Sequence, residues 1–178
     1  LGNSTAILMT ADHGDSLGTS GGMFDKCGDM PEELMDVPMV IYAPWMDGNK
    51  KVDSLTSNLD VVPTVLDLLN LPIPEYMDGV SLKAVAEGRA AERDALMCEH
   101  YGHMDNFYSQ RVLYQDGFKL ITTEGEPDQL YHIAADPFEQ EELSKTPEVQ
   151  ERYRAMKARL KEEQEKFHDD QPLVQKEH

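Results

Sequence analysis

The sequence predicts an α/β fold followed by a small antiparallel β subdomain with a carboxyl-terminal helix. Two short, continuous apolar runs at residues 6–9 and 37–43 are typical of strands buried on both faces of a parallel sheet. The second half of the chain shows short extended segments separated by turn residues. We place the boundary near Arg89, so that residues 1–89 form the α/β part and residues 90–178 form the subdomain.

The α/β part contains one helical segment within residues 57–74. Its apolar residues recur at helical spacing at Leu59, Val62, Leu66 and Leu69. Asp60 can cap the helix, and Pro63 falls in its first turn, where a missing N–H costs little. Pro72 ends the helix, and residues 77–94 are expected to form a loop, a short helical turn and a polar connector.

Four extended runs predict an antiparallel meander in the subdomain. They cover residues 95–101, 109–115, 118–124 and 129–133. Asp116 and Gly117 form the turn between the second and third runs. Thr146 and Pro147 begin a helix, whose apolar stripe comprises Val149, Tyr153, Met156 and Leu160. This stripe is expected to cover the sheet.

The composition limits the classes of partner. The 178 residues carry a formal net charge of −18, which repels polyanions and anionic membrane surfaces, so we expect no nucleic-acid partner. No apolar stretch approaches the roughly twenty residues that span a bilayer, so we expect no membrane partner. Cys27 and Cys98 match no paired zinc spacing and are expected to be thiols. Because the chain starts at Leu1 and soon enters a strand that needs neighbours, we expect a piece of a longer parent protein.

Asp12 and His13 come just past the carboxyl end of the first apolar run, where α/β sheets bind ligands. A carboxylate and a neutral imidazole can both ligate a divalent cation, and Gly14 lets the backbone turn sharply after them. Taken alone, the pair is better explained by an aspartate that accepts backbone N–H groups and a half-buried histidine ring. Lys26 follows a turn rich in glycine, and its ammonium can either neutralise an oxyanion or remain a solvated surface charge.

Several motifs together resemble a known family. The segments TADHGDSLG, GGMFDK and VPMVIYAP, then LDVVPTVLDLLNL with MDGVSL, resemble in this order the second half of the sulfatases of the alkaline phosphatase superfamily. The tail RVLYQDGFKLI followed by QLYHIAADPFEQEEL is similar to the end of that family, where a small antiparallel sheet precedes a closing helix. The resemblance covers residues 4 to about 165 and implies that residues 1–89 are part of an alkaline-phosphatase-like α/β domain.

The resemblance implies roles for individual residues. Asp12 matches the metal-ligating acid of the family's S/T-x-D-H/N-G motif, and His13 matches the next position, which contacts the metal or the ester oxygen. Lys26 matches the lysine that binds the sulfate group and assists the leaving oxygen. The family uses a divalent metal, here expected to be Ca²⁺ or else Mg²⁺ or Mn²⁺. Its nucleophile is a formylglycine made from Cys or Ser in a C/S-x-P-x-R motif.

His103 falls where related enzymes have polar residues near the mouth of the substrate site, and Arg111 begins the strand that follows. Both are candidate substrate-binding residues. Glu99 and His100 lie in the same stretch. A histidine in such a loop is also explained as a surface or structural group.

The sequence departs from the family in several places. Neither Cys27 nor Cys98 lies in the nucleophile motif, and the paired aspartates of the first strand are absent. The formylglycine is therefore expected outside this chain. His132 stands where relatives usually have aspartate, and the loop CGDMPEELMDVP lacks an aromatic residue before its paired glutamates. The second departure leaves open how the loop with Lys26 is held.

These observations predict the carboxyl-terminal part of a sulfatase that hydrolyses a sulfate ester, with a sulfated small molecule or glycan as substrate. The fragment alone is expected to be inactive, to need the missing amino-terminal half as a partner, and to self-associate without it. Two alternatives stay open: a phosphate or phosphonate ester hydrolase of the same superfamily, and a non-catalytic acidic interaction module.

Overall fold

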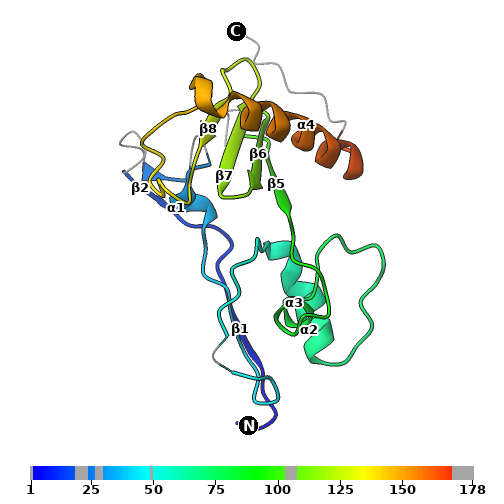
Figure 1. Cartoon of the computed structure of the whole chain (residues 1–178). Helices are drawn as coiled ribbons and strands as arrows, with labels where there is room; N and C mark the ends of the chain where they lie inside the picture. Colours follow the sequence, from blue (N-terminus) through cyan, green and yellow to red (C-terminus); the bar gives the residue numbers. More distant parts are fainter. Residues whose placement is uncertain (1, 19–23, 27–29, 49, 103–107, 170–178) are drawn as a thin grey trace. The chain divides into compact units, whose positions relative to one another are not determined.

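The computed structural model describes residues 2–18, 24–26, 30–48, 50–102 and 108–169. These residues fall into two compact units, which can be followed along the coloured chain in Figure 1. The first unit comprises Leu1–His13 and Asp36–Asp94, and the second comprises Gly14–Met35 and Ala95–His178. The division after Asp94 lies close to the boundary expected near Arg89. The segment Gly14–Met35 groups with the carboxyl-terminal sheet because its side-chain contacts run to that sheet.

The first unit contains a two-stranded sheet. Strand β1 (Ile7–Met9) pairs with β4 (Val40–Tyr42), and Met9 lies opposite Val40. Both expected strands are present, but they run antiparallel, so the expectation of a parallel pair is wrong. A continuous apolar run is typical of parallel sheets because it reports burial on both faces, and it therefore reports strand direction only indirectly. The loop after β1, which carries Asp12, therefore begins beside the start of β4 and not beside its end.

One face of this strand pair is apolar and open. Its four side chains are each more than half exposed: Ile7 at 58%, Met9 at 52%, Val40 at 51% and Tyr42 at 54%. Apolar side chains in a strand interior are ordinarily covered. Within the part of the chain that the structure describes, the strand pair therefore presents an uncovered apolar surface.

A 3₁₀ turn η1 (Asn58–Asp60) leads into helix α2 (Val61–Leu68), and a short helix α3 (Leu82–Ala86) follows. The expected helix is confirmed, although three residues of its apolar stripe are exposed: Leu59 at 61%, Val62 at 53% and Leu69 at 59%. The buried side of α2 instead contains Thr64, whose hydroxyl accepts the N–H of Leu82 at 2.9 Å and so joins α2 to α3.

The second unit is built on a four-stranded antiparallel meander, as expected. Its strands are β5 (Ala95–His100), β6 (Gln110–Gln115), β7 (Phe118–Thr123) and β8 (Gln129–Tyr131), paired in that order. Asp116 and Gly117 both have positive φ, at 51° and 76°, which is the geometry that a two-residue hairpin turn requires.

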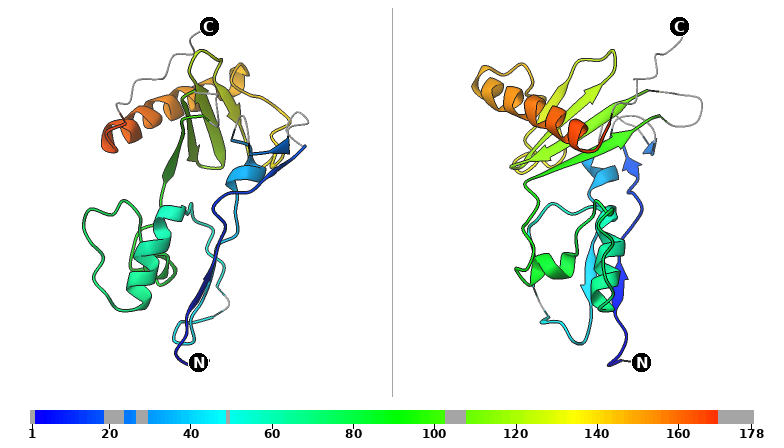
Figure 2. Two further views of the ribbon diagram at one scale, coloured as in Figure 1. Left: turned by 180° about the vertical axis from the view of Figure 1, so that it is seen from behind. Right: turned by 90° about the vertical axis from the view of Figure 1, so that its right-hand side faces the viewer.

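The carboxyl-terminal helix covers one face of this sheet. A 3₁₀ turn η2 (Pro147–Val149) leads into α4 (Gln150–Lys166), which crosses the strands in both views of Figure 2. Met156 and Leu160 are buried against a core from the sheet that includes Leu113, Leu120 and Leu130. The predicted stripe is confirmed, since Val149 and Tyr153 also pack there. Thr146 occupies the N-cap position without a side-chain hydrogen bond.

The amino-terminal part of the second unit is short. Strands β2 (Ser16–Leu17) and β3 (Phe24–Asp25) pair antiparallel, and helix α1 (Glu32–Met35) follows. Across the described ranges of both units, no helix has both the length and the apolar character needed to cross a membrane.

Candidate functional site

Asp12 and His13 form the tip of the loop that follows β1. The backbone N–H of His13 donates to Oδ1 of Asp12 at 3.0 Å, and Nε2 of His13 lies 3.6 Å from Oδ2 of Asp12. The Asp12 side chain is 88% exposed, whereas that of His13 is 37% exposed. The pair thus presents a carboxylate and an imidazole side by side at the surface of the first unit.

Asn58 supports this loop from the start of η1. Its side-chain amide donates to the carbonyl oxygens of Ala11 and Asp12 at 3.0 and 3.1 Å, and the Thr10 hydroxyl donates to its Oδ1 at 3.3 Å. The backbone of the loop is therefore tied to the helix entrance. Asn58 was not predicted from the sequence, because the residues next to it in the chain are those of an ordinary helix start.

The entrance of this helix is itself held by a buried acid. Asp60 is fully buried and accepts the backbone N–H of Ser57 at 2.8 Å in a capping box whose N-cap is Ser57. The expectation that Asp60 itself caps the helix is wrong, because at the N-cap position of α2 its side chain makes no capping hydrogen bond. Asp60 also accepts the N–H of Val80 at 2.8 Å and two guanidinium N–H groups of Arg93 at 2.8 and 2.9 Å. Arg93 lies in the expected polar connector and was not recognised from the sequence.

Lys26 directly follows β3 in the second unit, and it is exposed. The backbone of β3 is paired with β2, with Leu17 opposite Phe24. Lys26 and the Asp12–His13 pair belong to different units, so their proximity stays a prediction.

Gly14 has a different purpose from the one expected. It is not among the glycines with positive φ, so no special turn conformation requires it. Its N–H donates to the carbonyl of Leu34 at 2.8 Å, and a Cβ at this position would lie 1.9 Å from the carbonyl oxygen of Glu33. Gly14 is therefore needed for close backbone approach to α1, and any side chain would push the two segments apart.

Asp12 and His13 fit a divalent metal as two neighbouring ligands, but they do not complete a ligand set. Calcium and magnesium take about six ligands or more. Within the described ranges, no three His, Cys, Asp or Glu side chains gather closely enough to hold a metal ion. Among the residues that the structure describes, Asp12 and His13 would therefore need further ligands to hold such an ion.

Arg111 lies in β6 and has an intramolecular acid. Its Nε and Nη2 donate to the carboxylate of Asp169, both at 2.5 Å, and its Nη1 donates to the carbonyl of Gln110. The guanidinium also lies 4.7 Å from the ring centre of Tyr101. This ion pair lowers the pKa of the Asp169 carboxyl below its ordinary value of 3.8. The Arg111 side chain is only 4% exposed, so little of it is open to a substrate in this structure. A role of Arg111 toward substrate stays a prediction.

The other predicted residues are placed as follows. His103 and Cys27 lie outside the described residues. Cys98 lies in β5 as a thiol outside any disulfide.

His132 stacks on Phe118 with ring centres 4.2 Å apart, so its departure from the family pattern serves packing. Glu99 accepts the hydroxyl of Tyr101 at 2.8 Å, and the His100 ring lies 5.2 Å from that of Tyr108.

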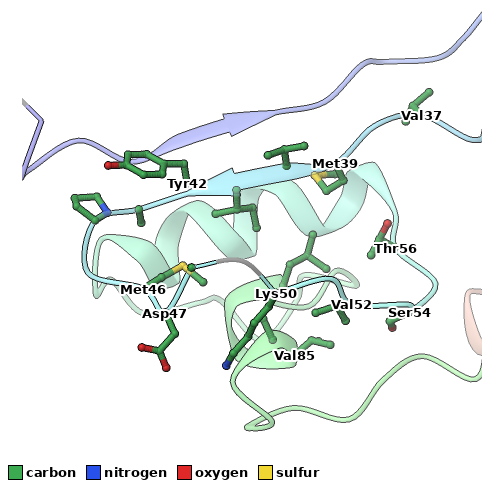
Figure 3. A pocket seen from close by; sticks show the side chains of 17 residues that line it. Val37, Met39, Tyr42, Met46, Asp47, Lys50, Val52, Ser54, Thr56 and Val85 are labelled. Carbon is green, nitrogen blue, oxygen red and sulfur yellow. The ribbon is translucent and has the colours of Figure 1, made fainter.

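A pocket of about 910 Å³ lies elsewhere in the first unit, between β4, the segment 46–56 and α3. Figure 3 shows that its labelled side chains are mostly apolar, with Asp47 and Lys50 as the charged ones. Neither Asp12 nor His13 lines it. The pocket therefore lacks the groups that the predicted chemistry needs.

Comparison with known proteins identifies the family. The family model for N-sulphoglucosamine sulphohydrolase, C-terminal, matches residues 19–166. The chain belongs to the sulfatase family. This sulfatase chain is 35% identical over 156 residues to the arylsulfatase of Clostridium perfringens, covering 84% of the chain and 31% of that protein. It is 29% identical over 180 residues to the N-acetylglucosamine-6-O-sulfatase of Bacteroides thetaiotaomicron, covering 96% of the chain and 32% of that protein.

Solved structures agree with the fold expected for a sulfatase. A protein solved in complex with its substrate D-glucosamine-2-N,6-O-disulfate has a TM-score of 0.77 and 29% identity, over 94% of this chain and 35% of that one. The phosphonate monoester hydrolase of Agrobacterium radiobacter has a TM-score of 0.73 and 25% identity, over 89% of this chain and 34% of that one. The sulfatase chain thus spans about a third of the length of its relatives and corresponds to their carboxyl-terminal part.

Proposed function

We propose that the protein containing this chain hydrolyses sulfate esters of carbohydrates. The observation that carries the proposal is the family match over residues 19–166. The sugar substrate is supported by the N-acetylglucosamine-6-O-sulfatase relative and by the neighbour solved with a disulfated glucosamine. The roles of individual residues rest on the motif positions together with the contacts described above.

In this proposal Asp12 and His13 are two of the ligands of a divalent metal, with Ca²⁺ as the expected ion and Mg²⁺ or Mn²⁺ as the alternatives. When bound, such an ion polarises and orients the oxygens of the sulfate group. Asn58 keeps the loop in place by donating to the carbonyls of Ala11 and Asp12, so that the two side chains remain adjacent. The remaining ligands and the formylglycine nucleophile would come from outside this chain.

Lys26 would bind the sulfate group in this proposal. Its ammonium is a compact positive charge in a chain whose net charge is −18, so local attraction must act against repulsion from the rest of the surface. A cation placed at the bridging oxygen stabilises the negative charge that develops there as the S–O bond breaks.

The test is an activity assay on the full-length parent protein with a panel of sulfated monosaccharides. Lys26→Ala is expected to lower kcat/KM by about 100- to 1,000-fold, as is typical when a charge-stabilising donor is removed. Lys51→Ala is the matched control, because Lys51 pairs with Asp53 at the surface and its side chain is 86% exposed. Equal activity of both variants, or no hydrolysis of any sulfate ester, would refute the proposal.

The fragment alone is proposed to be inactive and to need the amino-terminal half of the same enzyme. The open apolar face of the β1–β4 pair supports this requirement, since such a face is suited to further strands and helices. The assay is repeated on the 178-residue chain by itself. Turnover by the purified fragment would contradict the proposal.

A second candidate is hydrolysis of phosphonate or phosphate esters. It is favoured by the similarity to the phosphonate monoester hydrolase structure. Phosphonate monoesters are included in the same assay. A kcat/KM for a phosphonate monoester above that for every sulfate ester would assign the protein to this second activity.

A further inference from the structure

Lys119 is a fully buried lysine near the start of β7, on the face of the sheet opposite α4. Its ammonium lies 3.0 Å from Glu32 and 2.8 Å from Glu139, and it donates to the carbonyl of Met30. Tyr114, its cross-strand neighbour in β6, donates its hydroxyl to the same Glu32 carboxylate at 2.7 Å. A buried lysine with this many partners is uncommon and ties several segments to one point.

Glu139 joins this cluster with a strained backbone. Its φ is 52°, in the left-handed region that residues other than glycine rarely adopt. One carboxylate oxygen contacts the Lys119 ammonium, and the other accepts the backbone N–H of Glu32 at 2.9 Å. The cluster thus holds both the side chain and the backbone of the first residue of α1.

Helix α1 in turn holds the segment that leads to Lys26. The Glu33 carboxylate accepts the N–H of Leu17 in β2 at 2.7 Å, and the Leu34 carbonyl accepts the N–H of Gly14. Strand β2 pairs with β3, and β3 ends immediately before Lys26. A continuous series of contacts therefore runs from Lys119 through α1 and the β2–β3 pair to Lys26, within one unit.

We propose that Lys119, with Glu32 and Glu139, is a positioning residue for Lys26. The sheet and α4 share one hydrophobic core. The cluster attaches residues 30–35 to this sheet, and through them residues 14–18 and 24–26. No aromatic residue directly precedes these paired glutamates, and the loop is instead held by the glutamates themselves, since Glu32 contacts the sheet and Glu33 contacts β2. The consequence for catalysis rests on the proposed function, whereas the attachment itself does not.

The attachment is tested by amide hydrogen exchange on the 178-residue chain. Lys119→Met is expected to speed exchange at the Gly14 and Leu17 amides roughly tenfold more than at the core amides of Leu113 and Leu120, since each lost contact shifts a local opening equilibrium by about that factor. Lys157→Met is the matched control, because Lys157 in α4 pairs with Asp128 at 2.7 Å away from the Lys119 cluster and is 43% exposed. An equal increase at all amides would overturn the proposal, since it would make the cluster merely a source of global stability.

Glu33→Ala keeps the test decisive should Lys119→Met fail to fold. It removes the acceptor of the Leu17 N–H and leaves the buried cluster intact. Faster exchange confined to residues 14–18 and 24–26 is expected. Unchanged exchange there would contradict the series of contacts.

The catalytic consequence is tested by a double-mutant cycle in the full-length protein. If Lys119 acts through Lys26, Lys119→Met lowers kcat/KM in the native background but not in a Lys26→Ala background. Additive losses would overturn a positioning role. A native enzyme without sulfatase activity would refute the proposed function instead, and the exchange experiment alone would then decide whether Lys119 holds the segment.

Discussion

Replacement of Arg93 by methionine removes the cation from a fully buried carboxylate. In the native protein Asp60 is completely buried, and Arg93, with 18% of its side chain exposed, donates to both of its oxygens at 2.8 and 2.9 Å. Methionine preserves much of the apolar stem but none of the donors. The variant therefore leaves a buried charge that retains only the N–H groups of Ser57 and Val80.

The expected loss of stability is about 3 kcal/mol. Breaking a buried ion pair by removing one partner costs roughly 3–5 kcal/mol. We take the lower end because the guanidinium is partly exposed and water can enter in its place. For a unit of this size such a loss lowers Tm by roughly 12–24 °C. The loss extends to the Asp12 loop, because the capping box that Asp60 completes also places Asn58.

The assay is urea unfolding of the 178-residue chain, followed by far-UV circular dichroism, with free energies taken from the midpoint and slope. Lys51→Met is the control, because the Lys51–Asp53 pair lies at the surface and contributes little. The reasoning is refuted if Arg93→Met lowers the midpoint no more than this control does. It is also refuted if only the second unit is destabilised.

Three further predictions concern other parts of the molecule. Asn58→Ala should speed amide exchange at His13, because the loop loses the two hydrogen bonds that Asn58 donates to it. Exchange at Leu8 should not change, because β1 keeps its pairing with β4. Equal exchange rates at His13 in the variant and the native protein would contradict the role of Asn58. Arg111 lowers the pKa of the Asp169 carboxyl, so the ion pair stabilises the fold fully above the ordinary carboxyl pKa of 3.8. This stabilisation is lost as the pH falls below 3.8 and the carboxylate becomes protonated. Asp169→Asn should therefore flatten the dependence of Tm on pH in that range. Analytical ultracentrifugation should show that the chain self-associates as its concentration rises. Met9→Lys should reduce this self-association, because Met9 lies on the open apolar face of the β1–β4 pair. A monomer at all concentrations would contradict self-association through that face.

Local patterns predicted most of the second unit. The strands of the meander, the Asp116–Gly117 turn and the apolar stripe of α4 each depend on residues that are close in the sequence. Hydrophobic periodicity and turn chemistry report such features directly. The family motifs likewise led to the Asp12–His13 pair and to Lys26, whose functional roles stay predictions.

Long-range contacts were not predictable from the same patterns. The direction of β1 against β4 depends on how the long connection between them folds back, and an apolar run reports burial rather than the direction of pairing. Lys119 lies between the apolar residues Phe118 and Leu120, and a lysine in a strand by itself indicates a solvent-facing position. It is buried because the Met30 carbonyl, 89 residues away in sequence, is brought against it together with two carboxylates.

The family, the order of the elements and the candidate chemistry of Asp12, His13 and Lys26 were accessible from the residues alone, because each belongs to a short segment with its own pattern. The supporting contacts came only from the tertiary structure. Asn58 at the loop, Arg93 on Asp60, and Lys119 beneath α1 are single polar residues whose neighbours are distant in sequence. Their burial and partners depend on how remote segments pack, and no local periodicity encodes that packing.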